Sequence, residues 1–269
     1  MVKMSDLIKY LADDINTKII GLYIDSIDDI KEFESSLSYA KDKNKKIVLI
    51  KSGSNNITKD LVKHHTGGEE LFTNDDFNNM IKKYSCIRCD DLEEFIYTII
   101  TLSYYDTLPK GNRVASINLS GGEAALVGEM TDKFNLKFPR YNEKVTNYLI
   151  ERLPDYAHVS NPLDMTVTLS YDSEKFKDAL VCIMSQDDID LVLIGYTLLL
   201  HIDDPCIYYL IEAIEKTKLE LKDKMKPIFL MAFMSNTRNQ DAIEKLIKLG
   251  VVCLPSPYYG MKTLENICN

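Results

Sequence analysis

Hydrophobic residues follow two different patterns along the first half of the chain. Residues 17–25 (TKIIGLYID) and 45–53 (KKIVLIKSG) are continuous apolar runs that end in turn residues, which is typical of buried strands. Between these runs an amphipathic helix is predicted by the helical spacing of Ile30, Phe33, Leu37 and Ala40. Apolar strands that alternate with amphipathic helices predict a parallel sheet covered by helices on both faces.

Two further helices and a short strand complete this half. The first helix is predicted by the stripe Phe77, Met80, Ile81 and Tyr84, with Thr73 or Asn74 as its N-cap. Residues 85–89 (SCIRC) are predicted to form a short strand. The second helix is predicted by the apolar positions Leu92, Phe95, Ile96, Ile99 and Ile100.

A turn-rich segment at 106–112 (DTLPKGN) separates this half from a second unit. In the second unit apolar strands and amphipathic helices alternate in the same way. It begins with a strand at 113–120 (RVASINLS), after which Gly121 and Gly122 lead into a helix predicted to end near Lys133. Helices are predicted over 142–152 and 172–185, strands within 190–197, 227–233 and 251–255, and a last helix from about Tyr258.

The two halves repeat an order of elements without repeating a sequence. We therefore predict an α/β protein of two flavodoxin-like (Rossmann-like) domains with mainly parallel sheets, divided as 1–106 and 107–269. In such folds ligands bind at the carboxyl ends of strands, where helix N-termini face the crevice. Chemistry is therefore expected after Asp25, Lys51, Ser120, Thr197 and Phe233.

Length and composition narrow the class of protein. The 269 residues suit two ordinary domains, and 45% hydrophobic and 27% charged residues are typical of a globular chain. The net charge of −9 opposes binding to nucleic-acid phosphates. No apolar run reaches the ~20 residues that span a bilayer, and the N-terminus lacks a secretory signal. We expect a cytoplasmic protein that binds neither membrane nor nucleic acid.

The six cysteines are spread along the chain, which favours reduced thiols in the cytosol. Cys86 and Cys89 form an isolated C-x-x-C pair, for which we expect a structural role because zinc sites need further ligands.

Residues 63–68 (KHHTGG) join two of the four histidines to two glycines. Glycines let backbone N–H groups approach a small anion closely. We expect no metal here, because the ligand spacing of zinc sites is missing. A neutral imidazole can instead act as a nucleophile when a carboxylate holds its other ring nitrogen. An exposed loop with incidental histidines explains these residues equally well.

Several stretches, in chain order, carry a family resemblance: YLADDINTKIIGLYIDSI, KIVLIKSGS, HHTGG, DDLEEF, NLSGGEAALVGEM and LPDYAHVSNPLDMT. Together they resemble the NDP-forming acyl-CoA synthetases, a family that includes the ADP-forming acetate–CoA ligases and is related to succinyl-CoA synthetase. The resemblance runs over nearly the whole chain.

This resemblance implies a phosphoryl relay. Acyl-CoA and phosphate yield an acyl phosphate, which phosphorylates a histidine, and the histidine passes the group to ADP or GDP. The histidine corresponds to His65, preceded by His64 where the family usually has serine. The family glutamate that orients it corresponds to Asp25, which is one methylene shorter. The shorter side chain can shift the carboxylate by ~1 Å, and a displacement of that size can lower a rate about a hundredfold.

The resemblance also implies phosphate contacts. Lys51 lies in the family's lysine–glycine segment, and Gly67 and Gly68 lie beside the histidine. The alternative for Lys51 is a solvated lysine at a strand end. Ser120, Gly121 and Gly122 correspond to the start of a helix whose N-terminus stabilises the phosphohistidine, as the helix dipole favours. A tight turn that needs glycine explains these three residues equally well.

Asn161 and Asp164 are secondary candidates, because they match the family's Asn-Pro-x-Asp loop. A turn of purely structural value is the stronger alternative for this loop.

The family's CoA-binding domain, the opening part of its histidine domain and its ATP-grasp domain have no counterpart in this sequence. We therefore interpret 1–106 as an N-terminally incomplete phosphohistidine domain and 107–269 as a second succinyl-CoA-ligase-like flavodoxin domain. The resemblance implies a ligase subunit that works with separate CoA-binding and ATP-grasp chains, or self-associates. CoA and ADP/ATP or GDP/GTP with Mg²⁺ are its implied substrates, with no tightly bound cofactor. The alternative is a noncatalytic derivative that binds a partner or ligand.

Overall fold

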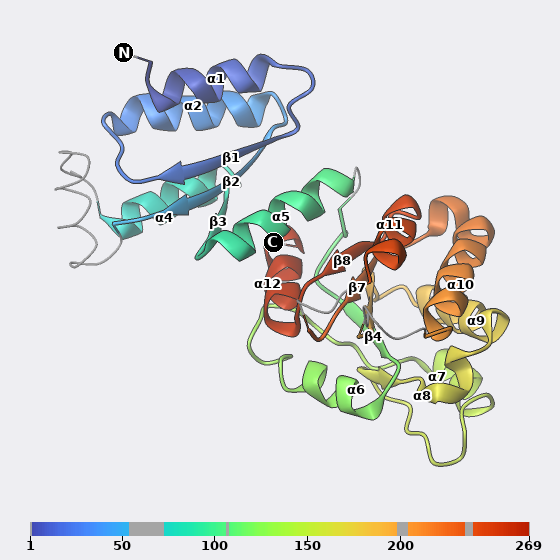
Figure 1. Cartoon of the computed structure of the whole chain (residues 1–269). Coiled ribbons are helices and arrows are strands. Elements are labelled where there is room, and N and C mark those ends of the chain that lie inside the picture. The colour runs from blue at the N-terminus through green and yellow to red at the C-terminus, as the bar shows by residue number, and fades with distance from the viewer. Residues whose placement is uncertain (1, 54–72, 106–107, 198–203, 235–238, 269) are drawn as a thin grey trace. The chain divides into compact units, whose positions relative to one another are not determined.

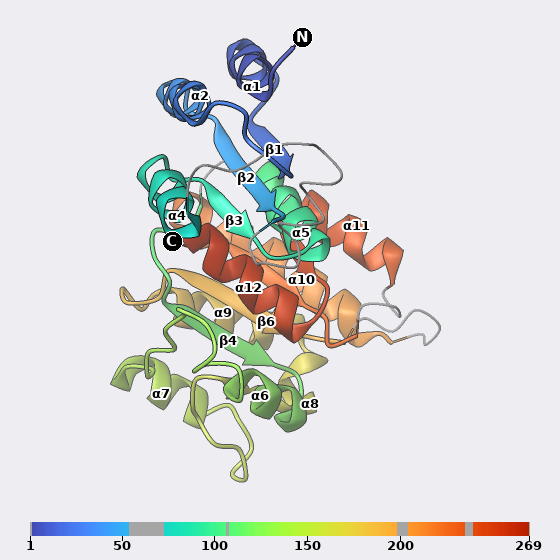
Figure 2. The same cartoon turned by 90° about the vertical axis from the view of Figure 1, so that its left-hand side faces the viewer.

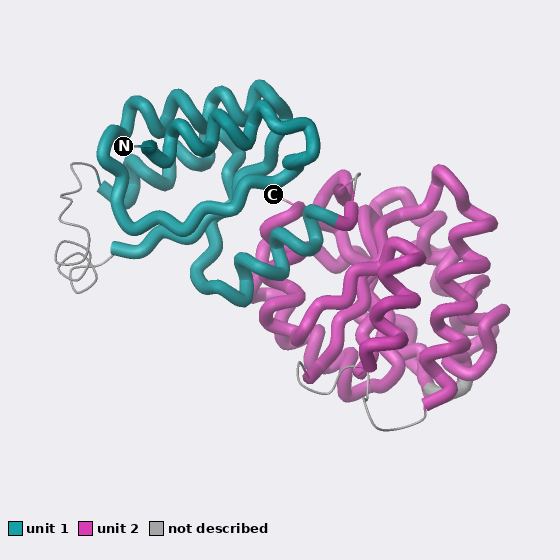
Figure 3. The backbone as a smooth tube through the Cα atoms, turned by 45° about the horizontal axis from the view of Figure 1, so that its top comes forward, with its two compact units in different colours: residues 1–103 teal, residues 104–269 magenta. Residues whose placement is uncertain are grey.

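The computed structural model describes residues 2–53, 73–105, 108–197, 204–234 and 239–268 (Figure 1). The chain divides into two compact units, residues 1–103 and 104–269 (Figure 3). The boundary predicted between residues 106 and 107 falls close to this division. None of the described helices is both long enough and apolar enough to cross a membrane.

Unit 1 contains a three-stranded parallel sheet in the order β1-β2-β3. Its elements in chain order are α1 (Met4–Asp13), β1 (Ile19–Ile24), α2 (Ile30–Asp42), β2 (Lys46–Lys51), α4 (Asn74–Lys83), β3 (Ile87–Cys89) and α5 (Leu92–Tyr104). Helix α4 begins after Thr73, whose hydroxyl accepts the N–H of Asp76, so the predicted N-cap is confirmed. Helix α1 was not predicted.

The helices of unit 1 cover the two faces of the sheet unequally. Helices α1, α2 and α4 share one apolar cluster with the sheet, in which Ile8, Leu37 and Phe77 are buried. Helix α5 lies on the other face (Figure 2). Its predicted apolar stripe is split, because Phe95 packs close to Gly21 of β1 whereas Leu92 is 58% exposed.

Unit 2 contains a five-stranded sheet in the order β5-β4-β6-β7-β8, and all its strand pairs are parallel. Its strands are β4 (Val114–Asn118), β5 (Leu163–Asp164), β6 (Leu191–Gly195), β7 (Ile228–Met231) and β8 (Val252–Leu254). Its helices are α6 (Gly121–Gly128), α7 (Glu143–Ile150), α8 (Thr166–Ser170), α9 (Ser173–Met184), α10 (Cys206–Leu221), α11 (Gln240–Lys248) and α12 (Pro257–Cys268), with a 3₁₀ turn at Lys222–Lys224. The α/β class and the parallel sheets are thus as predicted.

Every residue of β4, β6, β7 and β8 is buried, which explains their continuous apolar sequences. Figure 1 shows α9, α10 and α11 on one side of this sheet and α12 on the other. Helix α12 approaches closely at Gly260, where an added Cβ would lie 3.0 Å from the sulfur of Met231.

Helix α6 is shorter than predicted and ends at Gly128 rather than near Lys133. The N–H groups of Met130 and Thr131 bond to the carbonyls of Val127 and Gly128 at 3.0 and 3.2 Å, which are turn contacts. The Thr131 hydroxyl also donates to the Gly128 carbonyl at 2.8 Å. These bonds satisfy carbonyls at the end of the helix and stop it.

Replacing Gly21 by valine is expected to destabilise unit 1 by about 1–3 kcal/mol. A Cβ at this position would lie 2.9 Å from the Phe95 ring and 3.0 Å from Ile99, so α5 must shift away from β1. Urea unfolding followed by circular dichroism measures the loss. As a control, Gly128→Ala places a methyl group where nothing lies within 4 Å. Equal stability of the two variants would show that the close packing of α5 on β1 does not contribute to the stability of unit 1.

Candidate functional site

The carboxyl ends of β1 and β2 form the first part of the candidate site. Asp25 directly follows β1, and Lys51 at the end of β2 is paired in register with Ile24. The Ser52 N–H donates to the Ile24 carbonyl at 2.9 Å, and the Ser52 hydroxyl donates to the Asp25 carboxylate. Parallel pairing therefore brings Asp25 and Ser52 together. Sequence reasoning missed Ser52, although its place directly after a strand end was the available signal.

Lys51 is buried, with only 6% of its surface exposed. Its ammonium donates to the backbone carbonyls of Asp25 at 3.1 Å and Ser52 at 2.6 Å. The alternative interpretation of Lys51 as a solvated strand-end lysine is therefore wrong. The ammonium joins the ends of two strands and places a positive charge beside Asp25. Gly53 follows with a φ of +74°, a conformation that favours glycine.

His64, His65, Gly67 and Gly68 lie outside the described residues. Their assignment to the relay, and the orientation of His65 by Asp25, stay predictions. Of the site residues predicted in unit 1, the structure therefore describes Asp25 and Lys51, which lie together with Ser52.

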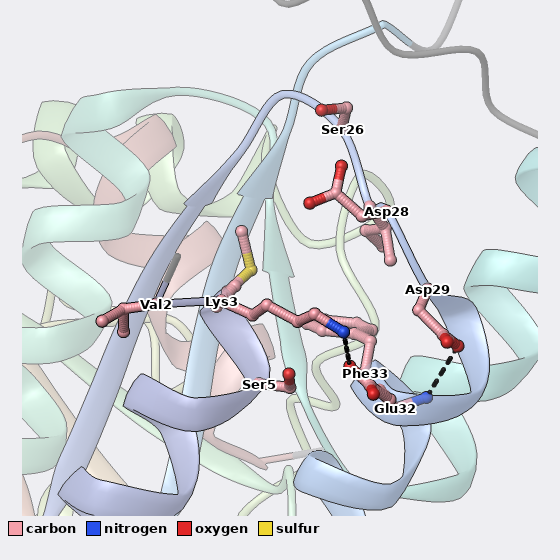
Figure 4. Close-up of a pocket in the computed structure, with 10 residues that line it drawn as sticks. Val2, Lys3, Ser5, Ser26, Asp28, Asp29, Glu32 and Phe33 are labelled. Atoms are coloured by element: carbon pink, nitrogen blue, oxygen red, sulfur yellow. Dashed lines mark hydrogen bonds and ion pairs between the residues drawn. The ribbon is translucent and has the colours of Figure 1, made fainter.

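A second feature of unit 1 is a pocket of about 210 Å³ bordered by the N-terminal ends of α1 and α2 (Figure 4). The Lys3 ammonium contacts the Glu32 carboxylate at 2.7 Å, and this hydrogen bond raises the pKa of Lys3. The Asp29 carboxylate caps α2 by accepting the N–H groups of Lys31 and Glu32. These charged groups bind one another or the backbone, so helix capping and a surface ion pair explain their positions.

The start of α6 forms the candidate site of unit 2. The Ser120 hydroxyl accepts the N–H of Glu123 at 3.3 Å, and the Ser120 carbonyl accepts that of Ala124 at 3.0 Å. Gly121 and Gly122 are exposed and form the first turn. The predicted turn from strand to helix is confirmed. Orphan N–H groups of a first helical turn can bind an anion.

Asp164 lies directly beside this first turn. A Cβ added to Gly121 would lie 3.0 Å from the Asp164 Oδ2, which explains the glycine. The Asp164 Oδ1 accepts the N–H of Thr166 at 2.9 Å. The structure thus brings the secondary candidate Asp164 together with the predicted glycines.

Asn161 has a different role from Asp164. Its amide group donates to the carbonyls of Val114 at 2.8 Å and Pro139 at 2.9 Å, and its Oδ1 accepts the N–H of Ser116 at 2.8 Å. All three partners are backbone groups, two of them in β4. This arrangement favours the structural alternative for Asn161.

Glu123 is a residue of this site that sequence reasoning missed. Its Oε1 accepts the N–H and the hydroxyl of Thr197 at 3.2 and 3.0 Å, whereas its Oε2 is buried without a hydrogen-bond partner. Burial raises the pKa of Glu123, and the bonds from Thr197 offset part of this effect. The spacing Ser120-x-x-Glu123 is that of a capping box, which was the available signal.

Glu123 also lines a pocket of about 190 Å³ at the carboxyl ends of β4 and β6. The Tyr196 hydroxyl donates to the Asp204 carboxylate, and both burial and this contact raise the pKa of Tyr196. The Cys206 thiol donates to the Ser170 carbonyl at 3.3 Å, and burial raises its pKa to about 11. Tyr196 and Cys206 are therefore protonated near neutral pH.

Within the described ranges, no group of three or more His, Cys, Asp and Glu side chains is placed to hold a metal ion. The cysteines of the C-x-x-C pair serve packing. Cys89 is buried, and its thiol lies 3.9 Å from the Thr98 hydroxyl. Burial raises the pKa of the Cys86 thiol to about 12, so it is not a thiolate nucleophile.

Comparison with protein families identifies the first unit. Residues 1–102 match the family described as the succinyl-CoA ligase-like flavodoxin domain. In this domain Asp25, Lys51 and Ser52 occupy the carboxyl edge of the parallel sheet.

The chain that carries this succinyl-CoA ligase-like domain is homologous to ADP-forming acetate–CoA ligases over part of their length. The enzyme of Methanocaldococcus jannaschii is 32% identical over 169 residues, which are 61% of this chain and 23% of that protein. Subunit alpha of the Pyrococcus furiosus ADP-forming acetate–CoA ligase II is 31% identical over 166 residues, which are 60% of this chain and 34% of that subunit. The chain therefore spans a quarter to a third of these relatives.

A solved structure shares the fold of both units of this chain. The acetyl-coenzyme A synthetase 1 of Ca. Korarchaeum cryptofilum, solved in complex with phosphate and ADP, superimposes with a TM-score of 0.78 at 17% identity. The superposition covers 99% of this chain and 56% of that one. The unit that follows the succinyl-CoA ligase-like domain thus shares its fold with part of this synthetase.

Replacing Asn161 by alanine is expected to destabilise unit 2 by about 2–4 kcal/mol, because the N–H of Ser116 and two carbonyls lose their partner. Thermal or urea unfolding measures the effect. The control is Asn147→Ala, which truncates an exposed asparagine on α7. If the two variants unfold alike, Asn161 does not stabilise β4. Its interpretation as a functional residue would then be favoured over the structural one.

Proposed function

We propose that this chain is the histidine-bearing part of an NDP-forming acyl-CoA synthetase and relays a phosphoryl group through His65 between an acyl phosphate and ADP or GDP. The observation that supports this proposal most is the cluster of Asp25, Ser52 and Lys51 at one sheet edge of a succinyl-CoA ligase-like domain. The reaction it serves is the interconversion of an acyl-CoA and its carboxylate.

The relay consists of two displacements at phosphorus. In the first, a ring nitrogen of His65 attacks the acyl phosphate, a P–N bond forms, and the P–O bond to the carboxylate breaks. In the second, the terminal phosphate oxygen of ADP or GDP attacks, and the P–N bond breaks. The other ring nitrogen keeps its proton, which a carboxylate can hold.

Asp25 is the carboxylate that we propose for this role. The Ser52 hydroxyl donates to its carboxylate, and the register of β1 and β2 fixes both residues. A fixed carboxylate selects one tautomer and one ring orientation of an adjacent imidazole. Lys51 supplies a buried positive charge beside it, which favours a phosphoryl group at this edge. Ser120, Gly121 and Gly122 at the start of α6 are further proposed phosphate-binding residues.

Incubation with its CoA-binding and ATP-grasp partner chains and γ-³²P-labelled ATP is expected to label the protein with an acid-labile, base-stable phosphate. His65→Ala abolishes the label, and Asp25→Ala slows labelling at least tenfold because the imidazole loses its orienting carboxylate. The control His158→Ala changes an exposed histidine in unit 2 and keeps the label. Labelling that survives in His65→Ala would contradict the relay.

The proposal includes a partner chain, because β1 and two helices of the domain expose large apolar side chains. Tyr23 on β1 is 58% exposed, Tyr10 on α1 is 73% exposed and Leu92 on α5 is 58% exposed. Among the described strands, β1 pairs only with β2, and unpaired edges favour strand addition or coverage. The homologous Pyrococcus furiosus chain is named a subunit alpha, which supports a partner as well.

The double variant Tyr23→Lys/Leu92→Glu is expected to weaken binding of the CoA-binding chain at least tenfold, because it places charges at two of these exposed apolar positions. Isothermal titration calorimetry measures the affinity. The control Tyr156→Lys changes a 79% exposed tyrosine of unit 2 and leaves binding unchanged. Unchanged affinity of the double variant would exclude this surface as the interface.

A noncatalytic derivative is the second candidate function. The specific observation in its favour is the pair of carboxylates, Glu123 and Asp164, in and beside the first turn of α6. Negative side chains there oppose a phosphoryl group. Partner binding without any phosphohistidine under the labelling conditions would select this function.

A further inference from the structure

A pocket of unit 1 contains a hydroxyl group that the fold leaves without a partner. The pocket has a volume of about 210 Å³ and is bordered by the first turns of α1 and α2 and by the loop after β1 (Figure 4). Ser5 on α1 lines it and is only 6% exposed. Among the described residues, no group forms a hydrogen bond with the Ser5 hydroxyl. Because the residue is so nearly enclosed and borders the pocket, its hydroxyl faces the pocket rather than open solvent.

The start of α1 does not explain this hydroxyl. The Lys3 N–H bonds to the Asp6 carboxylate at 3.0 Å, and the Asp6 N–H bonds to the Lys3 carbonyl at 3.1 Å, so the helix is capped without Ser5. A buried hydroxyl without a hydrogen bond costs free energy, whereas an alanine at the same place would not. The Ser5 hydroxyl is therefore available to a group that enters the pocket.

The charges that line the pocket favour a cation. The Glu32 carboxylate is bound by the Lys3 ammonium, and the Asp29 carboxylate caps α2. Asp28 also lines the pocket, and its carboxylate has no hydrogen bond or ion pair with any described residue. Lys3 is the one cation among the described lining residues, and it is already paired. One negative charge therefore stays unneutralised.

The floor of the pocket is apolar. Phe33 is 2% exposed and belongs to the apolar cluster of unit 1, and Met4 and Ile27 pack against that cluster. All three residues line the pocket. A volume of about 210 Å³ is below the usual range of sites for drug-sized ligands, so a short alkyl chain is the matching occupant.

We propose that this pocket binds a primary alkylammonium group, whose ammonium bonds to the Asp28 carboxylate and the Ser5 hydroxyl. The alkyl chain lies on the apolar floor. An ammonium has three N–H donors, and both oxygen groups can accept. The bond to the carboxylate is charge-assisted and therefore the stronger one. This site goes beyond the proposed function, because none of its residues takes part in the phosphoryl relay.

The probe is n-butylamine, titrated into the full chain and followed through the backbone amide signals of Ser5 and Asp28. About 150 mM NaCl screens weak attraction to the acidic surface. Saturable binding is expected. The neutral control 1-butanol has the same alkyl chain and should bind at least tenfold more weakly. Absence of a saturable shift, or equal binding of 1-butanol, overturns the inference.

Asp28→Asn should weaken n-butylamine binding at least tenfold, because the ammonium loses its counter-charge. The matched control is Asp75→Asn, which removes the same charge from an exposed residue in the first turn of α4. It should bind as wild type does. Equal weakening by the two variants would show a general attraction of amines to an acidic chain and would remove the site.

Ser5→Ala tests the hydroxyl separately. Its urea midpoint without ligand should be at least that of wild type, because the hydroxyl has no partner to lose. Its affinity for n-butylamine should fall three- to tenfold. Unchanged affinity, or a lowered urea midpoint that shows a structural role for the hydroxyl, contradicts the proposal.

A free amine and a lysine side chain present the same alkylammonium group. Nα-acetyl-lysine N-methylamide distinguishes them: binding at least as tight as that of n-butylamine identifies a lysine of another protein as the occupant, and weaker binding identifies a free amine. Both results uphold the ammonium site. His65→Ala should leave n-butylamine binding unchanged, so the amine site and the phosphoryl relay can fail independently.

Discussion

The parallel pairing of β1 with β2 is the constraint on which the candidate chemistry depends. It places the residues that follow the two strands at one edge, so that Asp25, Ser52 and Lys51 meet although about 26 residues of chain separate the strand ends. The buried Lys51 ammonium binds both strand ends through their carbonyls and fixes the edge further. A carboxylate held this firmly can define the orientation of an imidazole, which a mobile side chain cannot.

The two units present opposite electrostatic conditions at their strand ends. Unit 1 places a buried ammonium beside a carboxylate whose partner is a hydroxyl. Unit 2 offers the N–H groups of α6, but Asp164 lies beside Gly121 and Glu123 belongs to the first turn of the helix. The helix dipole of α6, equivalent to about half a positive charge, is thus already opposed by the chain's own carboxylates.

Most of the fold could be predicted because it depends on periodicity. Strands β2, β4, β6, β7 and β8 are almost entirely buried and have apolar sequences, and helices such as α2 and α4 have regular apolar stripes and clear caps. The end of α6 could not be predicted, since it depends on turn bonds at Gly128 and Thr131. Nor could the burial of Lys51, because strand-end lysines are usually solvated and its partners are backbone carbonyls. Glu123 and Thr197 are 74 residues apart, and only the pairing of β4 with β6 brings them together.

The central claim is that Asp25 orients His65, and the most direct measurement of it is ¹⁵N NMR of the protein labelled in its histidine rings. The account predicts that the His65 ring is held in a single tautomer in wild type, with a pKa above that of free histidine because a carboxylate stabilises the charged ring. Asp25→Asn should lower that pKa, while Asp28→Asn, on the same loop, should not. A His65 ring with the tautomer mixture and pKa of an exposed histidine in wild type would contradict the account.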